Sequence, residues 1–156
     1  MGICMTIALH AQELPDTQIK DVSSGKKVAF DQTIEKGKVT VISFWATWCI
    51  PCKKEIKNIS LKLPTWKKEA DFNYVTISID EARAESMVRS YAIEQGWNFP
   101  FYIDPNSDLK RSLSFQNVPY TMIIDKTGKV VFTHSGYEEG GEAEIWAKVK
   151  ELVAAK

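Results

Sequence analysis

Two cysteines separated by two residues form the part of this sequence best suited to chemistry. They lie in "FWATWCIPCKKEI", Phe44 to Ile56, with a proline between them and a tryptophan directly before them. Thiols at this spacing can bind a metal ion, form a structural disulfide, or exchange electrons with another thiol or disulfide. The residues around Cys49 and Cys52 favour the third chemistry.

A helix is predicted to begin near Pro51 and to end before Pro64, because proline suits a first helical turn and interrupts a later one. At 100° per residue, a buried stripe is expected from Cys52, Ile56, Ile59 and Leu63. The opposite, solvated side carries Lys53, Lys54 and Lys57, together with Leu61, for which the pattern gives no role. Cys49 is expected in a more open position before the first turn.

This difference between the two cysteines is what dithiol exchange requires. The attacking sulfur reacts as a thiolate, and free N–H groups and the helix dipole at a helix start stabilise negative charge. The second sulfur should be close but shielded, so that it attacks only a mixed disulfide that has already formed. We therefore expect Cys49 to be exposed and acidic, and Cys52 to be buried.

The two other chemistries fit less well. A structural zinc site needs four ligands, and outside this pair the only other cysteine and histidine residues are Cys4, His10 and His134. A structural disulfide remains open, but a bridge across so short a loop restricts the unfolded chain little. No metal and no cofactor are expected.

Composition describes an ordinary globular chain. Its 156 residues are 44% hydrophobic and 26% charged, which suits one domain with a substantial core. Basic and acidic residues number 20 each, and no sustained basic tract indicates nucleic acid or an anionic membrane as partner. No apolar run approaches the length of about 18 residues that a membrane span needs.

The N-terminus, "MGICMTIALHAQ", contains an apolar run from Ile3 to Leu9, and Ala11 is a suitable residue before a signal-peptidase cut. No Lys or Arg precedes this run, so an N-terminal strand or a tag remnant stays as the alternative. We interpret residues 1–11 as the remnant of an export signal, which would place the protein in the bacterial periplasm or cell envelope.

The remaining pattern predicts a mixed α/β sheet with helices on both faces. A hairpin turning at Ser23-Ser24-Gly25 comes first, and residues 39–45 and 72–80 are apolar enough to be strands covered on both sides. Helices are expected over residues 84–95, 107–115 and 141–155, the second of them capped by Ser107 or Asp108. Residues 99–104 form a short extended segment, and residues 120–134 form a hairpin around "KTG".

"FWATWCIPC" after an apolar strand, with "NVPYTMIID" some 70 residues later, resembles the thioredoxin superfamily. The segment "SIDEARAESMVRSYAIEQGWNFPFYID" and the leading "ELPDTQIKDVSSGKKVAF" are similar to its TlpA/ResA-like branch. The resemblance implies a thioredoxin-like fold over residues 12–156, as a single domain with an N-terminal β-hairpin extension and a central βα insertion.

The resemblance also implies roles for single residues. Cys49 matches the attacking cysteine and Cys52 the resolving one, Trp48 matches the aromatic residue beside them, and Pro119 matches a cis-proline. We expect the substrate to contact Trp48, Pro51, Val118 and Pro119. Thioredoxins proper carry a buried Asp where this chain has Ser43.

Glu55 lies one helical turn after Cys52 and resembles a buried Glu of ResA-like proteins. A carboxyl group in apolar surroundings has a raised pKa and can carry protons to or from a thiol. The alternative is a solvated Glu paired with nearby lysines. Relatives often have a proline shortly after this Glu, whereas "IKNI" follows here, so the helix is expected to be less kinked.

Together these features predict a monomeric, exported thiol-disulfide oxidoreductase that reduces disulfides of partner proteins and is recharged by an upstream thiol donor. The residues do not select among reduction, oxidation and isomerisation. Two alternatives remain. A peroxiredoxin-type peroxidase carries Thr-x-x-Cys, which Thr47 does not match because it lies two residues before Cys49. A thioredoxin-fold binding module would use the disulfide only structurally.

Overall fold

The computed structural model describes residues 13–156. The expected export-signal remnant at residues 1–11, with Cys4, lies outside the described residues. Within residues 13–156, no helix is both long and apolar enough to cross a lipid bilayer.

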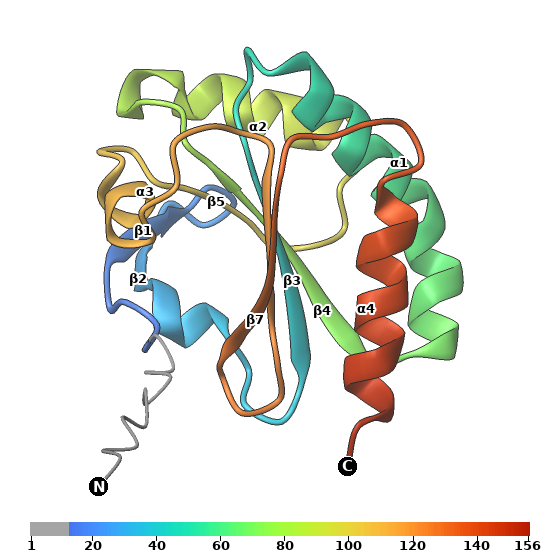
Figure 1. Ribbon diagram of the computed structural model, residues 1–156. Helices are drawn as coiled ribbons and strands as arrows, with labels where there is room; N and C mark the ends of the chain where they lie inside the picture. Colours follow the sequence, from blue (N-terminus) through green and yellow to red (C-terminus); the bar gives the residue numbers. More distant parts are fainter. Residues whose placement is uncertain (1–12) are drawn as a thin grey trace, which may run out of the picture.

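A seven-stranded mixed sheet forms the centre of the fold, in the order β2-β1-β5-β4-β3-β6-β7 (Figure 1). β3 is parallel to β4, and β4 to β5, whereas every other neighbouring pair is antiparallel. The expected mixed sheet is therefore confirmed. The strands are β1 (Gln18–Asp21), β2 (Lys27–Ala29), β3 (Val39–Trp45), β4 (Phe72–Ser78), β5 (Phe101–Ile103), β6 (Tyr120–Ile124) and β7 (Val130–Ser135).

Helices cover both faces of the sheet, as predicted. One apolar core packs beneath α1, α2 and α4, and a second core lies on the other face beneath α3 and the 3-10 turn η1. β3 is buried along its whole length because alternate residues enter opposite cores: Val41 and Trp45 the first, Ile42 and Phe44 the second. The helical segments are η1 (Phe30–Thr33), α1 (Ile50–Glu69), η2 (Ala82–Ala84), α2 (Glu85–Glu94), α3 (Asp108–Ser112) and α4 (Glu142–Ala154).

The prediction that the first helix ends before Pro64 is wrong, because α1 continues through Pro64 to Glu69. Pro64 lies on the exposed side of the helix, so its ring does not disturb the core. Two residues later, Trp66 is buried and stacks on Trp146 of α4 with ring centroids 4.9 Å apart. This packing between α1 and α4 holds the last turn in place despite the missing backbone N–H (Figure 1).

Pro64→Ala is expected to raise the free energy of unfolding by about 2 kcal/mol. The substitution restores one helical hydrogen bond and removes a steric conflict, and a more flexible unfolded chain offsets part of that gain. Urea unfolding of the variant and of the exposed neighbour control Thr65→Ala measures the effect. A lower stability for Pro64→Ala would contradict this explanation of the helix.

Ser107 is the N-cap residue of α3, one of the two residues predicted, but its side chain makes no capping hydrogen bond. The carboxylate of Asp104 accepts hydrogen bonds from the backbone N–H groups of Leu109 and Lys110, at 3.2 and 2.9 Å. The first hairpin is confirmed, and its turn is fixed by Asp21, which accepts from the N–H groups of Ser23 and Ser24.

Candidate active site

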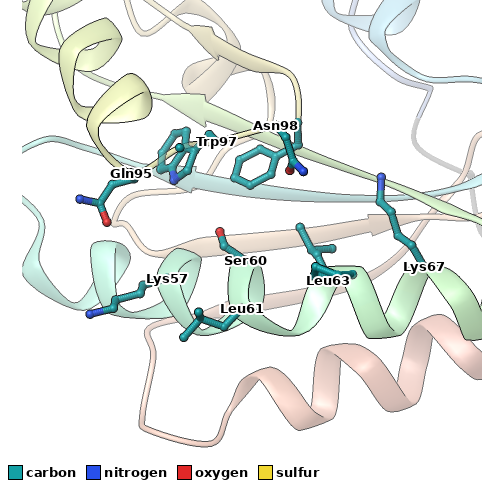
Figure 2. A pocket seen from close by; sticks show the side chains of 11 residues that line it. Lys57, Ser60, Leu61, Leu63, Lys67, Gln95, Trp97 and Asn98 are labelled. Carbon is teal, nitrogen blue, oxygen red and sulfur yellow. The ribbon is translucent and has the colours of Figure 1, made fainter.

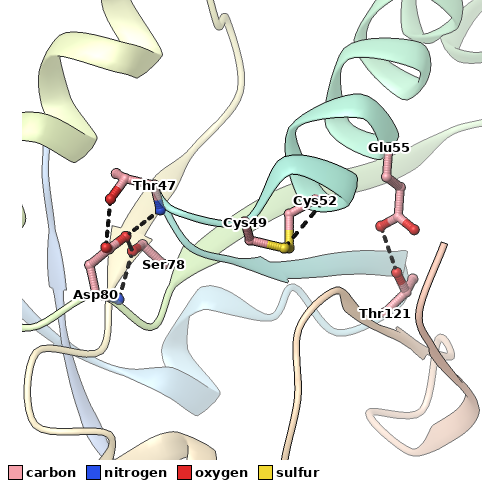
Figure 3. Close-up of a disulfide and its surroundings, with 7 residues drawn as sticks. All are labelled: Thr47, Cys49, Cys52, Glu55, Ser78, Asp80 and Thr121. Carbon is pink, nitrogen blue, oxygen red and sulfur yellow. Dashed lines mark hydrogen bonds between the residues drawn. A yellow bond between two sulfur atoms is a disulfide. The ribbon is translucent and has the colours of Figure 1, made fainter.

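Cys49 and Cys52 form a disulfide at the start of α1, directly after the loop that leaves the central strand β3 (Figure 3). Their Cα atoms are 5.3 Å apart. Cys49 is the N-cap residue of α1, and its sulfur accepts a hydrogen bond from the N–H of Cys52 at 3.3 Å. The first sulfur therefore lies where free N–H groups and the helix dipole favour a negative charge.

The prediction that Cys49 is exposed is wrong for this disulfide form. Cys49 is 5% exposed and Cys52 is 1% exposed, so both are buried and the expected difference is small. The bond to Cys52 holds the Cys49 sulfur against the core, where both cysteines pack with Trp45 and Ala46. Their chain neighbours are open to solvent instead, with Trp48 69% and Ile50 68% exposed.

Asp80 fixes the loop that carries Trp48, and the sequence analysis missed it. This carboxylate is 4% exposed and accepts from the N–H of Thr47 at 2.8 Å and from its hydroxyl at 2.7 Å (Figure 3). It also accepts from the Ser78 hydroxyl at 2.6 Å. The sequence could have indicated this role, because Asp80 follows directly after β4, the parallel neighbour of β3. The carboxyl ends of parallel strands lie at the same end of a sheet, so Asp80 is expected near the loop that follows β3.

Asp80→Ala is expected to lower the free energy of unfolding by about 3 kcal/mol, because it leaves the half-buried donors of Thr47 and the buried hydroxyl of Ser78 without an acceptor. Disulfide reduction should slow as well, since the loop before Cys49 loses its anchor. Asp71→Ala is the matched control: Asp71 is 82% exposed, and its ion pair with Lys38 contributes little. Equal stability of the two variants in urea would rule out the anchoring role.

Glu55 lies buried one turn after Cys52, as predicted, with 1% of its surface exposed. The hydroxyl of Thr121 donates a hydrogen bond to its carboxyl group at 3.0 Å (Figure 3). Burial raises the pKa of Glu55 to about 7; the Thr121 hydrogen bond lowers this pKa and the charge of Glu142 raises it further. Glu55 can therefore gain and lose a proton near neutral pH.

Ser43 carries no charge at the strand position below the site. It is buried in β3 opposite Thr121 of β6, and its oxygen accepts a hydrogen bond from the Tyr74 hydroxyl at 3.0 Å. Burial also raises the pKa of Tyr74, which stays neutral. Glu55 is thus the acidic group that this part of the core presents near Cys52.

Pro119 follows a cis peptide bond after Val118, as predicted. It directly precedes β6, in which Tyr120 pairs with Phe44 of β3. The register places Pro119 at the sheet edge from which the chain enters the Cys49 loop. Val118 is half-buried and Pro51 is exposed. The fold thus gathers Trp48, Pro51 and the Val118–Pro119 pair at one end of the sheet.

Lys53, in the first turn of α1, contacts an aromatic ring. The Lys53 ammonium group lies 4.8 Å from the centre of the Tyr91 ring, a cation–π contact that keeps it from being a purely solvated lysine. Within residues 13–156, no three His, Cys, Asp or Glu side chains gather closely enough to bind a metal ion.

This arrangement defines a thioredoxin-like protein: a mixed sheet, a CxxC disulfide at the start of the helix after the central strand, and a cis-proline at the same edge. The chain belongs to the Redoxin family, whose model matches residues 10–150. With its CxxC pair, it is a thiol-disulfide oxidoreductase.

Curated relatives and solved structures agree with this assignment. The chain is 30% identical over 137 residues to "Thiol-disulfide oxidoreductase ResA" from Bacillus thuringiensis (strain Al Hakam), covering 88% of this chain and 76% of that protein. It is 32% identical over 129 residues to "Thioredoxin-like protein YneN" from Bacillus subtilis, covering 81% and 72%.

Among solved structures, an uncharacterized thioredoxin-like protein from Porphyromonas gingivalis superposes with a TM-score of 0.80 at 38% identity, covering 90% of this chain and 91% of that one. A thiol:disulfide interchange protein from Chlorobium tepidum TLS gives a TM-score of 0.72 at 25% identity, with 92% and 97% covered. The expected thioredoxin-like fold is confirmed.

Proposed function

We propose that this protein reduces disulfides of partner proteins in the bacterial cell envelope. One observation carries the proposal: Cys49 is the N-cap residue of α1 and is bonded to Cys52, which lies on the buried stripe of the same helix. In the reduced protein, the helix start stabilises a Cys49 thiolate, and the apolar core disfavours one at Cys52.

The reaction runs in two exchange steps. The Cys49 thiolate attacks one sulfur of the partner disulfide, forms a mixed disulfide and releases the other partner sulfur as a thiolate. The Cys52 thiolate then attacks Cys49 in this mixed disulfide and releases the second partner sulfur. The partner gains two electrons and the protein keeps the Cys49–Cys52 disulfide, which an upstream thiol donor must reduce.

Glu55 supplies and removes the proton in these steps. Its carboxyl group is buried one turn from Cys52, and a pKa of about 7 lets it take the proton that the Cys52 thiol must lose before it attacks. Thr121 orients this carboxyl group through its hydrogen bond.

Trp48, Pro51 and Val118 form the surface for the partner in this proposal, with Pro119, which is buried, directly after Val118 in the chain. Trp48 is exposed and lines a groove of about 440 Å³ together with Ile79 and Met87, next to the disulfide along the chain. Exposed aromatic and sulfur-containing side chains provide apolar contact area that adapts to different sequences.

Location in the cell envelope is supported by two features. Residues 3–9 form an apolar run that precedes Ala11, as in an export signal. Disulfides form and persist in exported proteins, where a CxxC enzyme finds both oxidised substrates and a use for reducing power.

Insulin reduction in the presence of dithiothreitol tests the activity. The protein should speed the precipitation of reduced insulin chains, and Cys49→Ser should return the rate to that of dithiothreitol alone. Peroxide consumption, measured in parallel, should stay at the background rate. Rapid consumption of peroxide without insulin reduction would favour the peroxidase, and neither activity would favour the binding module.

A further inference from the structure

The outward face of α1 carries features that the exchange reaction does not use. Ile50, Lys54, Lys57, Leu61 and Lys68 fall within about 60° of one another on the helix, opposite its buried stripe. We call these five residues the outer stripe. All five are exposed. Ile50, at 68%, and Leu61, at 71%, are among the most exposed large hydrophobic side chains in the described part of the chain.

Charge is concentrated on this helix although the whole chain is neutral. α1 carries six lysines and two glutamates, one of which is the buried Glu55. Within residues 13–156, the three lysines of the outer stripe and the adjacent Lys67 take part in no ion pair, whereas Lys62 binds Glu142 at 2.6 Å. The outer stripe therefore presents positive charge that the described structure leaves unmatched.

Two grooves run along the sides of the outer stripe. One, of about 440 Å³, lies between α1 and the segment that joins α2 to β5 (Figure 2). Leu61 and Leu63 lie on its helix side and Trp97 and Phe99 on the other, with Lys57 and Lys67 along it, and none of its lining residues is acidic. The second groove, of about 400 Å³, is lined by Ile50, Pro51, Lys54, Lys57, Asn58, Tyr137 and Glu139.

Isolated exposed apolar side chains are common on protein surfaces. Here, however, the exposed Leu61 lies among lysines and beside a groove with aromatic walls, and the second groove includes Pro51 of the CxxC segment. The surface thus reaches Pro51, which lies between the two cysteines in the chain. These grooves can accommodate an inserted side chain of a protein partner, whereas a flat lipid surface would leave them unfilled. The positive charge of the lysines along them favours acidic residues on that partner.

We propose that the outer stripe of α1, with its two grooves, binds an acidic protein partner. This partner undergoes thiol-disulfide exchange with Cys49 and Cys52. The partner places acidic side chains over Lys54, Lys57 and Lys68 and an apolar side chain beside Leu61. The identity of this partner as a redox partner rests on the proposed function. The preference for an acidic polypeptide rests on the outer stripe alone.

Disulfide peptides of opposite charge test this docking. Leu61 lies about 18 Å along the helix from Cys49, a distance that about six extended residues span. Each of the two peptides therefore has one central cysteine in a disulfide with mercaptoethanol, and a neutral spacer of that length on each side of it. Both ends of one peptide carry a leucine among glutamates, and both ends of the other carry a leucine among lysines. At low salt, the reduced protein should reduce the glutamate peptide at least about tenfold faster than the lysine peptide. At 1 M salt, the two rates should agree within about twofold, because salt screens the charges.

Matched variants separate local docking from net charge. Lys57→Glu/Lys68→Glu should abolish the preference for the glutamate peptide. Lys26→Glu/Lys27→Glu changes the net charge equally at exposed positions in the first hairpin, and should retain the preference. The neutral bis(2-hydroxyethyl) disulfide should react at the same rate with all three proteins. Equal rates for both peptides, or equal losses in both double variants, would overturn the proposal.

A binding measurement needs no redox reaction. A cysteine-free glutamate peptide should shift the amide NMR signals of α1 around Leu61, and Leu61→Ser should weaken its binding about fivefold. Shifts confined to other elements would overturn the docking site, as would binding to phosphatidylglycerol vesicles through Lys57 and Lys68 without preference for the peptide. If the wild-type protein fails to reduce the neutral disulfide, the proposed function fails, while this titration still decides the docking.

Discussion

Cys52→Ser protein is expected to accumulate mixed disulfides with its partners through Cys49. The Cys49 thiolate still attacks, but the sulfur that would release the partner is absent, so the intermediate persists. Cys49→Ser should trap almost nothing, because Cys52 is 1% exposed and lies on the buried stripe of α1. Insulin reduction should fall to the rate of dithiothreitol alone in both variants.

Non-reducing gels and mass mapping of the cross-linked cysteine measure the trapping. The variant lacking both cysteines is the matched control for adventitious disulfides. Equal trapping by the two single variants would mean that either sulfur can attack. That outcome would contradict the two-step mechanism, in which Cys49 attacks because it is the N-cap residue of α1. The two cysteines differ little in burial in the disulfide form, at 5% and 1% exposure, so the trapping experiment is needed to distinguish them.

Glu55→Gln should remove a pH dependence from both stability and thiol chemistry. The pKa of Glu55 is about 7 in the folded protein and about 4.5 ordinarily. Between these values the unfolded chain loses the Glu55 proton and the folded protein keeps it, so the free energy of unfolding of the wild type falls as the pH rises. The loss approaches about 3 kcal/mol above pH 7 and is absent below pH 4.5.

The variant keeps the shape and an oxygen that can accept from Thr121, but it has no charge to bury. The free energy of unfolding of oxidised Glu55→Gln minus that of the oxidised wild type should therefore increase by about 3 kcal/mol from about pH 4 to about pH 8. In the reduced variant, the apparent pKa of Cys49 should drop and disulfide reduction should lose one ionisation, because a nearby negative charge no longer opposes the thiolate.

Urea unfolding of the disulfide forms measures the first effect, and ultraviolet thiolate absorbance across pH measures the second. Glu69→Gln is a suitable control, because Glu69 is an exposed residue at the end of the same helix. Superimposable pH curves for Glu55→Gln and the wild type would leave Glu55 without a part in the chemistry.

The local pattern of the sequence was enough to predict most of the elements. The fully apolar run at residues 39–45 predicted a strand covered on both faces, and β3 is buried between two cores. The 100° periodicity after Cys49 placed Cys52, Ile56, Ile59 and Leu63 toward the core, and all four are buried. These predictions succeeded because they depend on side-chain periodicity, which is a property of neighbouring residues.

Tertiary contacts decided the features that the sequence analysis missed or misplaced. α1 passes through Pro64 because Trp66 packs on Trp146, which lies 80 residues further along the chain. Asp80 anchors the loop before Cys49 because two parallel strands end at the same sheet edge.

The environment of the reactive groups was decided in the same way. The spacing of the cysteines identified the CxxC pair, and the resemblance to the TlpA/ResA-like proteins pointed to Pro119 and to the carboxyl group of Glu55. Folding brings the Glu55 carboxyl group next to β6, where the Thr121 hydroxyl donates a hydrogen bond to it. Folding also places Cys49 in the apolar core. The physical reason is that burial, and the pKa values that follow from it, depend on residues brought together from distant parts of the chain.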